Sequence, residues 1–492
     1  MSCTNRQCQV TYTRLPHHTI TIVNPQTKHS RNHPSKKHPF GTLPKTTVHS
    51  GNSTMATIKD LPNELLIEIL SSIPKTEKKT FWSLCLTSKL FRALAEPLLY
   101  HSYQFYYQYN SPSLSFITSV ANRPELALHV RSVVIDGWQL KHYPKNPQLG
   151  TQTQALLRQA AERFRYPPAY INKWKGDLSN SVDDARFALM LLLTAKLEEL
   201  SLIFPSYDIE IKDPWFLRLV DKALDDPVRI RFHEFRHLKT LKVAYSEFAH
   251  GGFLLTTFAP LFRLPALRTF EATKCFQPND MPAYHWPEKS SSMESITFHQ
   301  SQLSREALHA LLRACKGIKH FNFGWTCMVP LSEEPQHIDY IALDSSLRTQ
   351  QHSLETLSLS FADIRAEELW AFDPNVIGSL RSLRAFPNLK SITVPVNALL
   401  DFAANTSADP SIAARAQLAN LLPSSLERLR FVNRIYRHVV RFQQLQGFAD
   451  HALGLFPRFK HLEVCSSDVE NEDWTLLRDR LREREVVLVV NA

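Results

Sequence analysis

The chain has 492 residues, 43% of them hydrophobic and 21% charged, which is typical of a folded protein rather than a disordered one. Its 12 glycines form neither G-x-G-x-x-G nor G-x-x-x-x-G-K-S/T, which argues against a phosphate-binding loop. The formal net charge of +10 is concentrated in residues 1–54, which hold seven Lys and Arg and no acidic residue. The nearly neutral remainder does not indicate a nucleic-acid-binding domain.

The sequence also argues against membrane and secreted classes. Its apolar runs are far shorter than the roughly 20 residues that span a bilayer, and no apolar segment opens the chain as a secretory signal does. The seven cysteines are an odd number and form no C-x-x-C pair, which indicates reduced thiols without a thiolate metal site. We therefore expect a cytoplasmic or nuclear protein with no membrane partner, no nucleic acid, no metal and no cofactor.

Residues 1–54 are rich in Thr, His, Pro and basic residues and lack apolar periodicity. This composition predicts a disordered basic tail. Two alternatives stay open. Translation starting at Met55 would remove the tail, and the acid-poor, Arg-containing start weakly resembles a transit peptide.

Residues 55–105 are predicted to form a compact helical unit. Its first helix carries apolar residues at helical spacing, with Pro62 in the first turn, where a missing N–H is tolerated. A second short helix follows near residues 81–86. Ser88 is positioned to cap a third helix, which Pro97 should kink or restart. The first apolar stripe comprises Leu61, Leu65, Leu66, Ile69, Leu70 and Ile73.

From residue 130 onward the pattern apolar-x-x-apolar-x-apolar recurs ten times, with starts 25 to 67 residues apart. The shorter spacings match the period of roughly 20–29 residues of leucine-rich repeats, and the longer ones leave room for outer helices. The ten segments are 130–135, 197–202, 238–243, 267–272, 293–298, 318–323, 354–359, 389–394, 426–431 and 459–464.

Two further regularities accompany these segments. Leucine-rich repeats place Asn or Cys three positions after each segment, where the buried side chain bonds the turn backbone, and six of the ten positions here are small polar residues or Cys. Helical patterns at 153–165, 183–196, 305–314 and 472–482 lie between or after the segments, and residues 486–490 predict a closing strand. The ten turn positions are Trp138, Pro205, Ser246, Cys275, Ser301, Thr326, Ala362, Asn397, Arg434 and Ser467.

Two α/β architectures fit this alternation of strands and helices. A doubly wound sheet buries both of its faces, and its strands read as continuous apolar runs. Here polar residues interleave with apolar ones, as Thr240 and Lys242 do around Leu241, so one strand face must meet water. We therefore predict for residues 106–492 an irregular, leucine-rich-repeat-like α/β solenoid, with a curved parallel sheet and outer helices.

The water-facing strand positions form the predicted binding surface. They include Glu199, Lys242, Glu271, His320, Asn322, Thr356, Ser358, Arg428, Arg430 and Glu463. The candidates for substrate contact are Lys242, Glu271, His320, Asn322, Arg428 and Arg430. Both charge signs occur, so the sequence predicts no polarity for the partner. The basic cluster at residues 428–441 is interpreted as a solvated face, with an acidic or phosphorylated peptide, or nucleic acid, as alternatives.

One string of residues has the form of a catalytic motif. His233, Glu234 and His237 form a literal H-E-x-x-H, in which two His one helical turn apart bind Zn²⁺ and the Glu activates water. The motif requires a helix of several turns, whereas a repeat segment begins at Leu238. We therefore interpret these residues as a turn and keep a zinc hydrolase as an alternative.

Residues 57–103 resemble an F-box. The resemblance rests on Leu61-Pro62-x-Glu64-Leu65-Leu66-x-x-Ile69-Leu70, followed by Leu84-x-Leu86-Thr87-Ser88-x-x-Phe91. The closing Glu96-Pro97-Leu98-Leu99-Tyr100 is similar to F-box proteins with leucine-rich repeats that are abundant in filamentous fungi. The family implies binding to a Skp-type adaptor, and through it to a cullin scaffold. The candidates for adaptor contact or local core are Leu61, Pro62, Leu65, Leu66, Ile69, Leu70, Leu84, Leu86 and Phe91.

The two regions together predict a protein-interaction subunit rather than an enzyme. By the resemblance, the small all-α F-box binds the adaptor, and the repeats recruit an unidentified substrate protein to a cullin–RING ubiquitin ligase, whose other subunits catalyse transfer. Three helices of under fifty residues also carry more large apolar side chains than such a unit covers by itself. The alternatives are a leucine-rich-repeat scaffold with no ligase role and a helical unit that merely caps the repeats.

Overall fold

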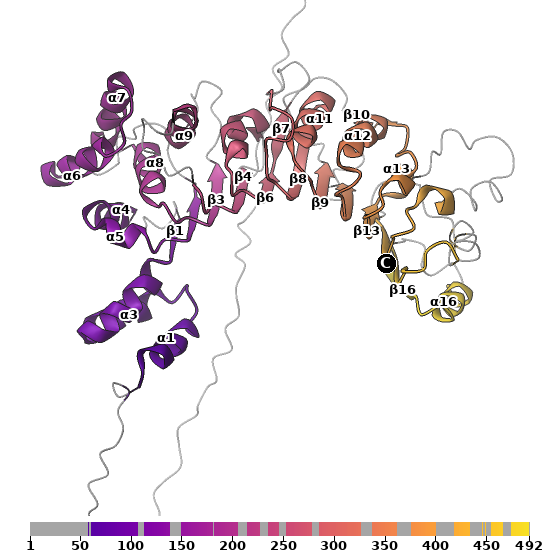
Figure 1. Ribbon diagram of the computed structural model, residues 1–492, viewed down its shortest axis with the longest axis horizontal. Helices are drawn as coiled ribbons and strands as arrows, with labels where there is room; N and C mark the ends of the chain where they lie inside the picture. The colour runs from indigo at the N-terminus through magenta and orange to yellow at the C-terminus, as the bar shows by residue number, and fades with distance from the viewer. Residues whose placement is uncertain are drawn as a thin grey trace, which may run out of the picture. The chain divides into compact units, whose positions relative to one another are not determined.

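The computed structural model divides the chain into two compact units, residues 1–60 and 61–492. The residues that it describes are 58, 61–106, 113–137, 149–180, 182–204, 214–226, 235–245, 252–277, 285–325, 337–361, 375–399, 418–432, 445, 448, 454–465 and 474–491. The predicted basic tail lies outside these residues. All helices and strands named below belong to the second unit, in which helices and strands alternate (Figure 1).

Three helices open the second unit, and the rest are spread between strands. The α-helices are α1 (Asn63–Ser71), α2 (Lys78–Thr87), α3 (Lys89–Tyr100), α4 (Ser113–Asn122), α5 (Pro124–Ala127), α6 (Thr151–Glu162), α7 (Pro168–Ser179), α8 (Asp183–Leu193), α9 (Trp215–Asp225), α11 (Arg305–Ala314), α12 (Tyr340–Leu347), α13 (Val396–Leu399) and α16 (Thr475–Arg482). The 3-10 helices are η3 (Leu255–Arg263), η4 (Arg348–Gln350) and η6 (Leu383–Ala385).

The strands of the main sheet are parallel, and their order in space follows their order along the chain. They are β1 (Ser102–Tyr106), β2 (Ser132–Asp136), β3 (Glu199–Phe204), β4 (Thr240–Tyr245), β6 (Thr269–Thr273), β8 (Ser295–Leu303), β9 (His320–Trp325), β11 (Thr356–Phe361), β13 (Ser391–Val394), β14 (Arg428–Phe431), β15 (His461–Cys465) and β16 (Val487–Asn491). Two short strands, β5 (Phe253–Leu254) and β7 (Cys275–Gln277), join this sheet beside β8, and β10 (His337–Asp339) pairs with β12 (Asn375–Ile377). A doubly wound sheet, which reverses its strand order, is excluded for the described strands.

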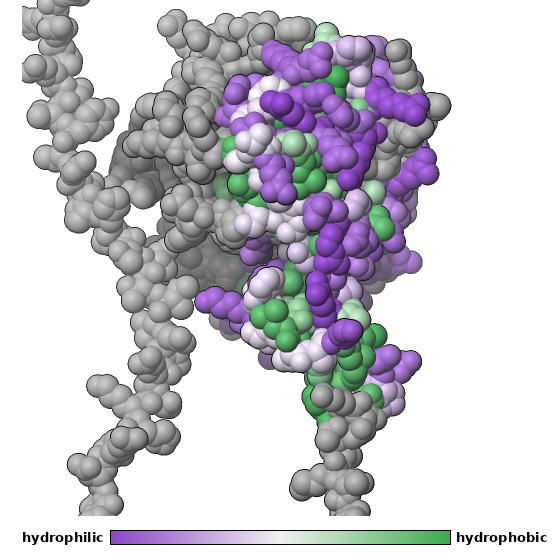
Figure 2. All heavy atoms as spheres, turned by 90° about the vertical axis from the view of Figure 1, so that its left-hand side faces the viewer, coloured by the Kyte–Doolittle hydropathy of each residue, from purple (hydrophilic) through white to green (hydrophobic). Residues whose placement is uncertain are grey.

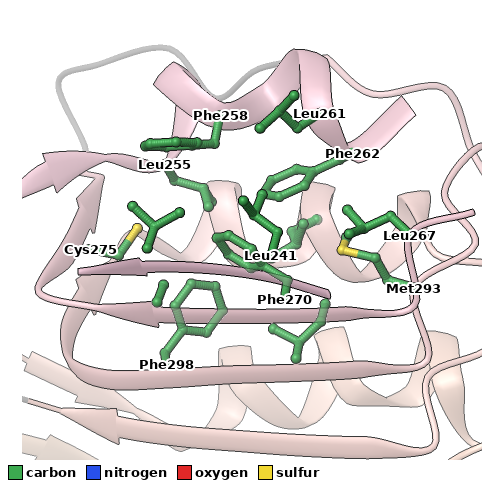
Figure 3. Packing of buried hydrophobic residues seen from close by; sticks show 14 of the residues in the cluster. Leu241, Leu255, Phe258, Leu261, Phe262, Leu267, Phe270, Cys275, Met293 and Phe298 are labelled. Atoms are coloured by element: carbon green, nitrogen blue, oxygen red, sulfur yellow. The ribbon is translucent and has the colours of Figure 1, made fainter. Parts of the chain in front are cut away.

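Alternation along each strand separates a covered face from an open one. In β4, Leu241 and Val243 are buried and Lys242 is exposed, because successive side chains point to opposite faces. The helices that connect the strands lie on the covered face, on the outer side of the curved sheet (Figure 1). Around Phe270, the strand side chains pack against η3, where the rings of Phe262 and Phe270 meet edge to face with centroids 4.7 Å apart (Figure 3).

A repeated hydrogen-bond pattern fixes the register of neighbouring strands. The N–H groups of Lys319 and His320 both donate to the carbonyl of Glu294, at 2.8 and 3.0 Å. The same pattern, in which two successive N–H groups donate to one carbonyl, recurs at the start of successive strands. The residues at these positions mostly alternate in charge along the sheet. One resulting ion pair joins the Lys319 Nζ to a Glu294 carboxylate oxygen at 2.6 Å. We call this row the edge ladder. It comprises Arg131, Glu198, Lys239, Arg268, Glu294, Lys319, Glu355, Lys390, Glu427 and Lys460.

The three N-terminal helices form a small core of their own. It is centred on Leu70, Phe81 and Ala95, which are all buried. The Ser88 hydroxyl accepts a hydrogen bond from the Phe91 N–H at 3.1 Å and so caps α3, as predicted. Pro97 does not restart α3, because the helix continues through it to Tyr100. Its last turn leads directly into β1 of the sheet, a strand that the sequence analysis did not predict.

The predicted repeat architecture is confirmed element by element. Each of the ten segments contains or overlaps a strand of the main sheet, and the closing strand is β16. The four predicted helical stretches are found as α6, α8, α11 and α16. Of the ten turn positions, Cys275 and Ser301 are buried, and the Cys275 N–H donates to the Ser301 Oγ at 3.1 Å. The other turn positions, including the Asn397 side chain, lie outside the described residues. None of the described helices is long and apolar enough to cross a bilayer.

Candidate functional site

The predicted adaptor residues in the helical unit divide into a buried set and an exposed set. Leu66 and Leu70 point inward from α1 and are 1% and 3% exposed, and Phe91 is also buried. Leu84 is partly buried against the local core. These four side chains are already covered within the chain, wholly or in part, so they are not free to contact a partner in this conformation.

The exposed set forms a row along α1. Leu65 and Ile69 are four residues apart in α1, so their side chains lie on one helix face, about 5–6 Å apart. Leu61 precedes the helix and is 37% exposed. Leu65 and Ile69 are each 46% exposed. We call this row the α1 stripe. Pro62, which precedes α1, is also exposed.

The second helix adds exposed apolar side chains to the unit. Leu86, predicted from the F-box resemblance, is 70% exposed. Trp82 is 58% exposed and was not predicted, and Ile67 on α1 was also missed. The signal available in the sequence is that α1 and α2 carry apolar residues beyond a single stripe. Apolar surface gathers in the lower part of the described face in Figure 2, where the N-terminal helices lie.

The sheet brings the predicted substrate residues together on its open face. Strand register places Lys242, Glu271 and Asn322 in one row across the sheet, which continues to Arg430 and Glu463. A neighbouring row contains His320 and Thr356 and continues through Ser391 to Arg428. All these side chains are at least partly exposed.

Most charges on this face are neutralised within the chain. The Lys242 Nζ lies 2.7 Å from the Glu271 Oε2, and the His299 Nε2 lies 3.7 Å from the other oxygen of that carboxylate. The Arg430 Nε lies 3.2 Å from the Glu463 Oε1. Arg428 is different, because no carboxylate in the described part of the chain lies within 4 Å of its exposed guanidinium.

A depression lies at the C-terminal end of the open face, across β13, β14 and β15. Its volume is about 560 Å³. Arg428 and Arg430 line it, with hydroxyl groups from β13 and the exposed Val487 of β16 at its border. The complete lining is Ser391, Ile392, Thr393, Glu427, Arg428, Leu429, Arg430, Lys460, His461, Glu463 and Val487. We call this site the C-terminal depression.

Comparison with known families agrees with this geometry. Residues 237–476 match the leucine-rich repeat domain family. The match spans eight of the ten predicted segments and ends where α16 begins, and it does not reach the helical unit. No curated protein matches the chain.

Leucine-rich repeat domains have a characteristic binding surface. Such repeats stack so that each contacts only its neighbours, and the stack presents an extended concave surface on which these domains typically bind protein partners. The match and the open sheet therefore support a protein-interaction role for this part of the chain.

The zinc-hydrolase alternative falls at the start of the repeat domain. His233 and Glu234 lie outside the described residues, whereas His237 belongs to a turn. Phe235 lies between Glu234 and His237 in the sequence and has a φ of 41°. This value belongs to the left-handed region of backbone conformation, which does not occur inside an α-helix. The helix that would place both His on one face is therefore interrupted. Nowhere among the described residues do three or more His, Cys, Asp or Glu side chains cluster in a way that could hold a metal ion.

A second cavity, of about 660 Å³, lies among α3, α4, α5 and α6. Its one charged lining residue is Arg123, which forms two hydrogen bonds to the Glu96 carboxylate, at 2.8 and 2.9 Å. The hydrogen bond from Arg123 lowers the pKa of the Glu96 carboxyl. This guanidinium already holds α3 against the start of α5. Because the only charged group of the lining is thus engaged, we interpret the cavity as a packing feature rather than a binding site.

Proposed function

We propose that this protein is the substrate-recognition subunit of a cullin–RING ubiquitin ligase. In this proposal the helical unit is an F-box that docks onto a Skp-type adaptor, and the leucine-rich repeat domain holds the protein to be modified. The chain itself is not an enzyme, and catalysis belongs to other subunits of the complex.

The observation that carries the proposal is the exposure of the α1 stripe. Burying one Leu or Ile side chain contributes roughly 1.5–3 kcal/mol, yet Leu65 and Ile69 remain half exposed beside a well-formed local core. Helix-in-groove recognition uses apolar anchors with this spacing along one face. A groove of a partner protein therefore accounts for side chains that the chain leaves uncovered.

The connection between the helical unit and the sheet fits an adaptor role. Helix α3 passes into β1, which pairs with β2 along its whole length. The Lys78 Nζ donates to the Leu99 carbonyl at 2.8 Å, which ties α2 to the end of α3. Arg123 joins α3 to α5 through Glu96. These contacts let the helical unit hold a bound adaptor in a defined position with respect to the first repeats.

The proposal places the protein in the cytoplasm or nucleus. The cysteines support this localisation, because Cys85, Cys275 and Cys315 are free thiols in the described part of the chain. Burial raises the pKa of the Cys275 thiol well above its ordinary value and that of Cys315 to about 12. Both thiols therefore stay protonated at neutral pH, which suits a packed interior rather than redox or metal chemistry.

The proposal is tested by binding of purified full-length chain to a purified Skp-type adaptor, alone and with its cullin. The informative variant is Leu65→Asp with Ile69→Asp, because both side chains are exposed and neither belongs to the core. The matched control is Leu476→Asp on α16, a leucine with similar exposure, 48%, at the other end of the unit. We expect adaptor binding for the wild type and the control and its loss in the double variant.

Leu66 is unsuitable for this purpose, because an Asp at that buried position disrupts the three-helix core. Absence of binding by the wild-type chain would reject the ligase proposal and favour a repeat scaffold with no ligase role. Equal loss of binding in the control and the double variant would show that the α1 stripe is not the contact.

A further inference from the structure

We propose that the C-terminal depression binds acidic side chains of the protein that the repeat domain recognises. This inference rests on the proposed function, because it names the chemistry of the recognised segment. It extends the sequence analysis, in which the mixed charges of the open face predicted no polarity. The structure resolves that ambiguity by showing which charges are already paired.

Ion pairing within the chain makes the middle of the open face electrostatically different from its C-terminal end. In the middle of the sheet, Lys242 is neutralised by Glu271 at 2.7 Å. At the C-terminal end, Arg428 has no carboxylate within ion-pair distance among the described residues, and Lys460 on the edge ladder has none either. An incoming carboxylate therefore gains a new charge-assisted contact at Arg428, whereas at Lys242 it competes with an existing ion pair.

The carboxylates already in the depression do not cancel its positive charge. Glu463 is engaged by Arg430 at 3.2 Å and by the His461 Nε2 at 4.0 Å. Glu427 is the second carboxylate of the lining. Three formal cations, Arg428, Arg430 and Lys460, thus face two carboxylates, with His461 counted as neutral.

The neighbours of Arg428 provide further donors for an anionic oxygen. In the sheet register Arg428 lies between Ser391 of β13 and His461 of β15, and neighbouring strands are about 4.8 Å apart. A carboxylate bound by the guanidinium therefore comes within reach of a hydroxyl group on one side and an imidazole on the other. The planar guanidinium also favours a two-oxygen acceptor over a neutral group.

The ligand that we assign to the depression is a carboxylate-bearing peptide segment of a protein partner. The test uses full-length chain and a fluorescently labelled peptide of alternating Ser and Glu, followed by fluorescence anisotropy. The parallel probes are a Ser-Lys peptide of equal length, the same peptide backbone with phosphoserine in place of Glu, and a single-stranded oligonucleotide. We expect the Ser-Glu peptide to bind, the Ser-Lys peptide not to bind, and affinity to fall with added salt.

The key variant is Arg428→Gln, which removes the charge at an exposed position and should fold normally. We expect it to weaken binding of the Ser-Glu peptide about tenfold, as the loss of one charge-assisted hydrogen-bonding partner predicts. Lys460→Gln should have a smaller effect. The matched control is Arg305→Gln, an exposed arginine on the outer helix α11 and away from the open face, which should leave the affinity unchanged.

Several outcomes overturn the inference. They are no binding of the Ser-Glu peptide, equal weakening by Arg305→Gln, or full affinity in Arg428→Gln. Binding of the phosphoserine peptide alone or of the oligonucleotide alone also contradicts the assignment to carboxylate side chains. Adaptor binding is measured on the same variants and should be unaffected, so failure of the depression and failure of the ligase proposal remain distinguishable.

Discussion

The helical unit and the repeat domain use apolar side chains in opposite ways. In the repeat domain, strand residues such as Leu241, Phe270 and Phe298 are completely buried, because each lies between neighbouring repeats and beneath an outer helix. In the helical unit, α1 has a neighbour on one side only, so Leu66 and Leu70 are covered and Leu65 and Ile69 are not. The same residue type thus serves as core in one region and as exposed surface in the other, according to the number of layers around it.

The largest effect is expected in the interior of the repeat domain. Phe270→Ala removes a fully buried ring that contacts Phe262 and Phe298, and we expect it to lower the free energy of unfolding by about 4 kcal/mol. The neighbouring Thr269→Ala, on the open face, should change it by less than about 0.5 kcal/mol. Equilibrium urea unfolding measures both. Similar losses for the two variants would contradict the two-faced sheet.

Two adjacent leucines of α1, the exposed Leu65 and the buried Leu66, test the difference between the exposed and the buried face of this helix. Leu66→Ala opens a cavity in the three-helix unit and should destabilise it by about 3 kcal/mol, whereas Leu65→Ala should have almost no effect on stability and should weaken adaptor binding instead. Hydrogen exchange of the α1–α3 amides reports the first effect, and an adaptor titration reports the second. If Leu65→Ala destabilises the unit as strongly as Leu66→Ala, the α1 stripe is part of the core.

A buried amide joins two repeats where no apolar side chain could do so. The Gln350 Oε1 accepts from the Ile318 N–H at 2.9 Å, and its Nε2 donates to the Leu312 carbonyl at 2.7 Å. Gln350→Met keeps the volume but leaves these backbone groups unpaired, so we expect a loss of about 2 kcal/mol in the free energy of unfolding. The control is Gln351→Met, one residue later on the less buried side of the turn. Equal stability of Gln350→Met and wild type would show that the amide is not needed.

The smallest effect is expected at the junction of the two regions. Arg123 lowers the pKa of Glu96 below its ordinary value of 4.5, so their ion pair stabilises the fold above about pH 4.5 and this contribution is lost as the pH falls through the lowered pKa. Because both groups are partly exposed, Glu96→Gln should cost about 1 kcal/mol at pH 6. The free energies of unfolding of wild type and variant, measured in urea, should therefore converge as the pH falls through the lowered pKa of Glu96. A difference that persists below that pKa would indicate a packing effect rather than an ionic one.

Much of the repeat domain was predictable because its signal is local and recurrent. Each strand contributes the same apolar spacing, and sheet geometry then puts Lys242 and Glu271 in one row. Strand β1 escaped prediction because Ser102–Tyr106 follows α3 without a turn signal and lacks the full repeat spacing. The alternative that α3 restarts at Pro97 followed from propensity, which disfavours Pro inside a helix. The packing of Leu94, Leu98 and Leu99 against the local core instead keeps α3 continuous.

The sequence alone determined the alternation of strands and outer helices, the presence of three N-terminal helices, and the residues that face water on each strand. These follow from periodicity, because side-chain direction repeats every 2.0 residues in a strand and every 3.6 in a helix. Only the tertiary structure decided which leucines of α1 remain uncovered and which charges of the open face remain unpaired. Burial and ion pairing depend on what lies across from a side chain, and residues such as Lys242 and Glu271 become neighbours only when distant segments pair in register.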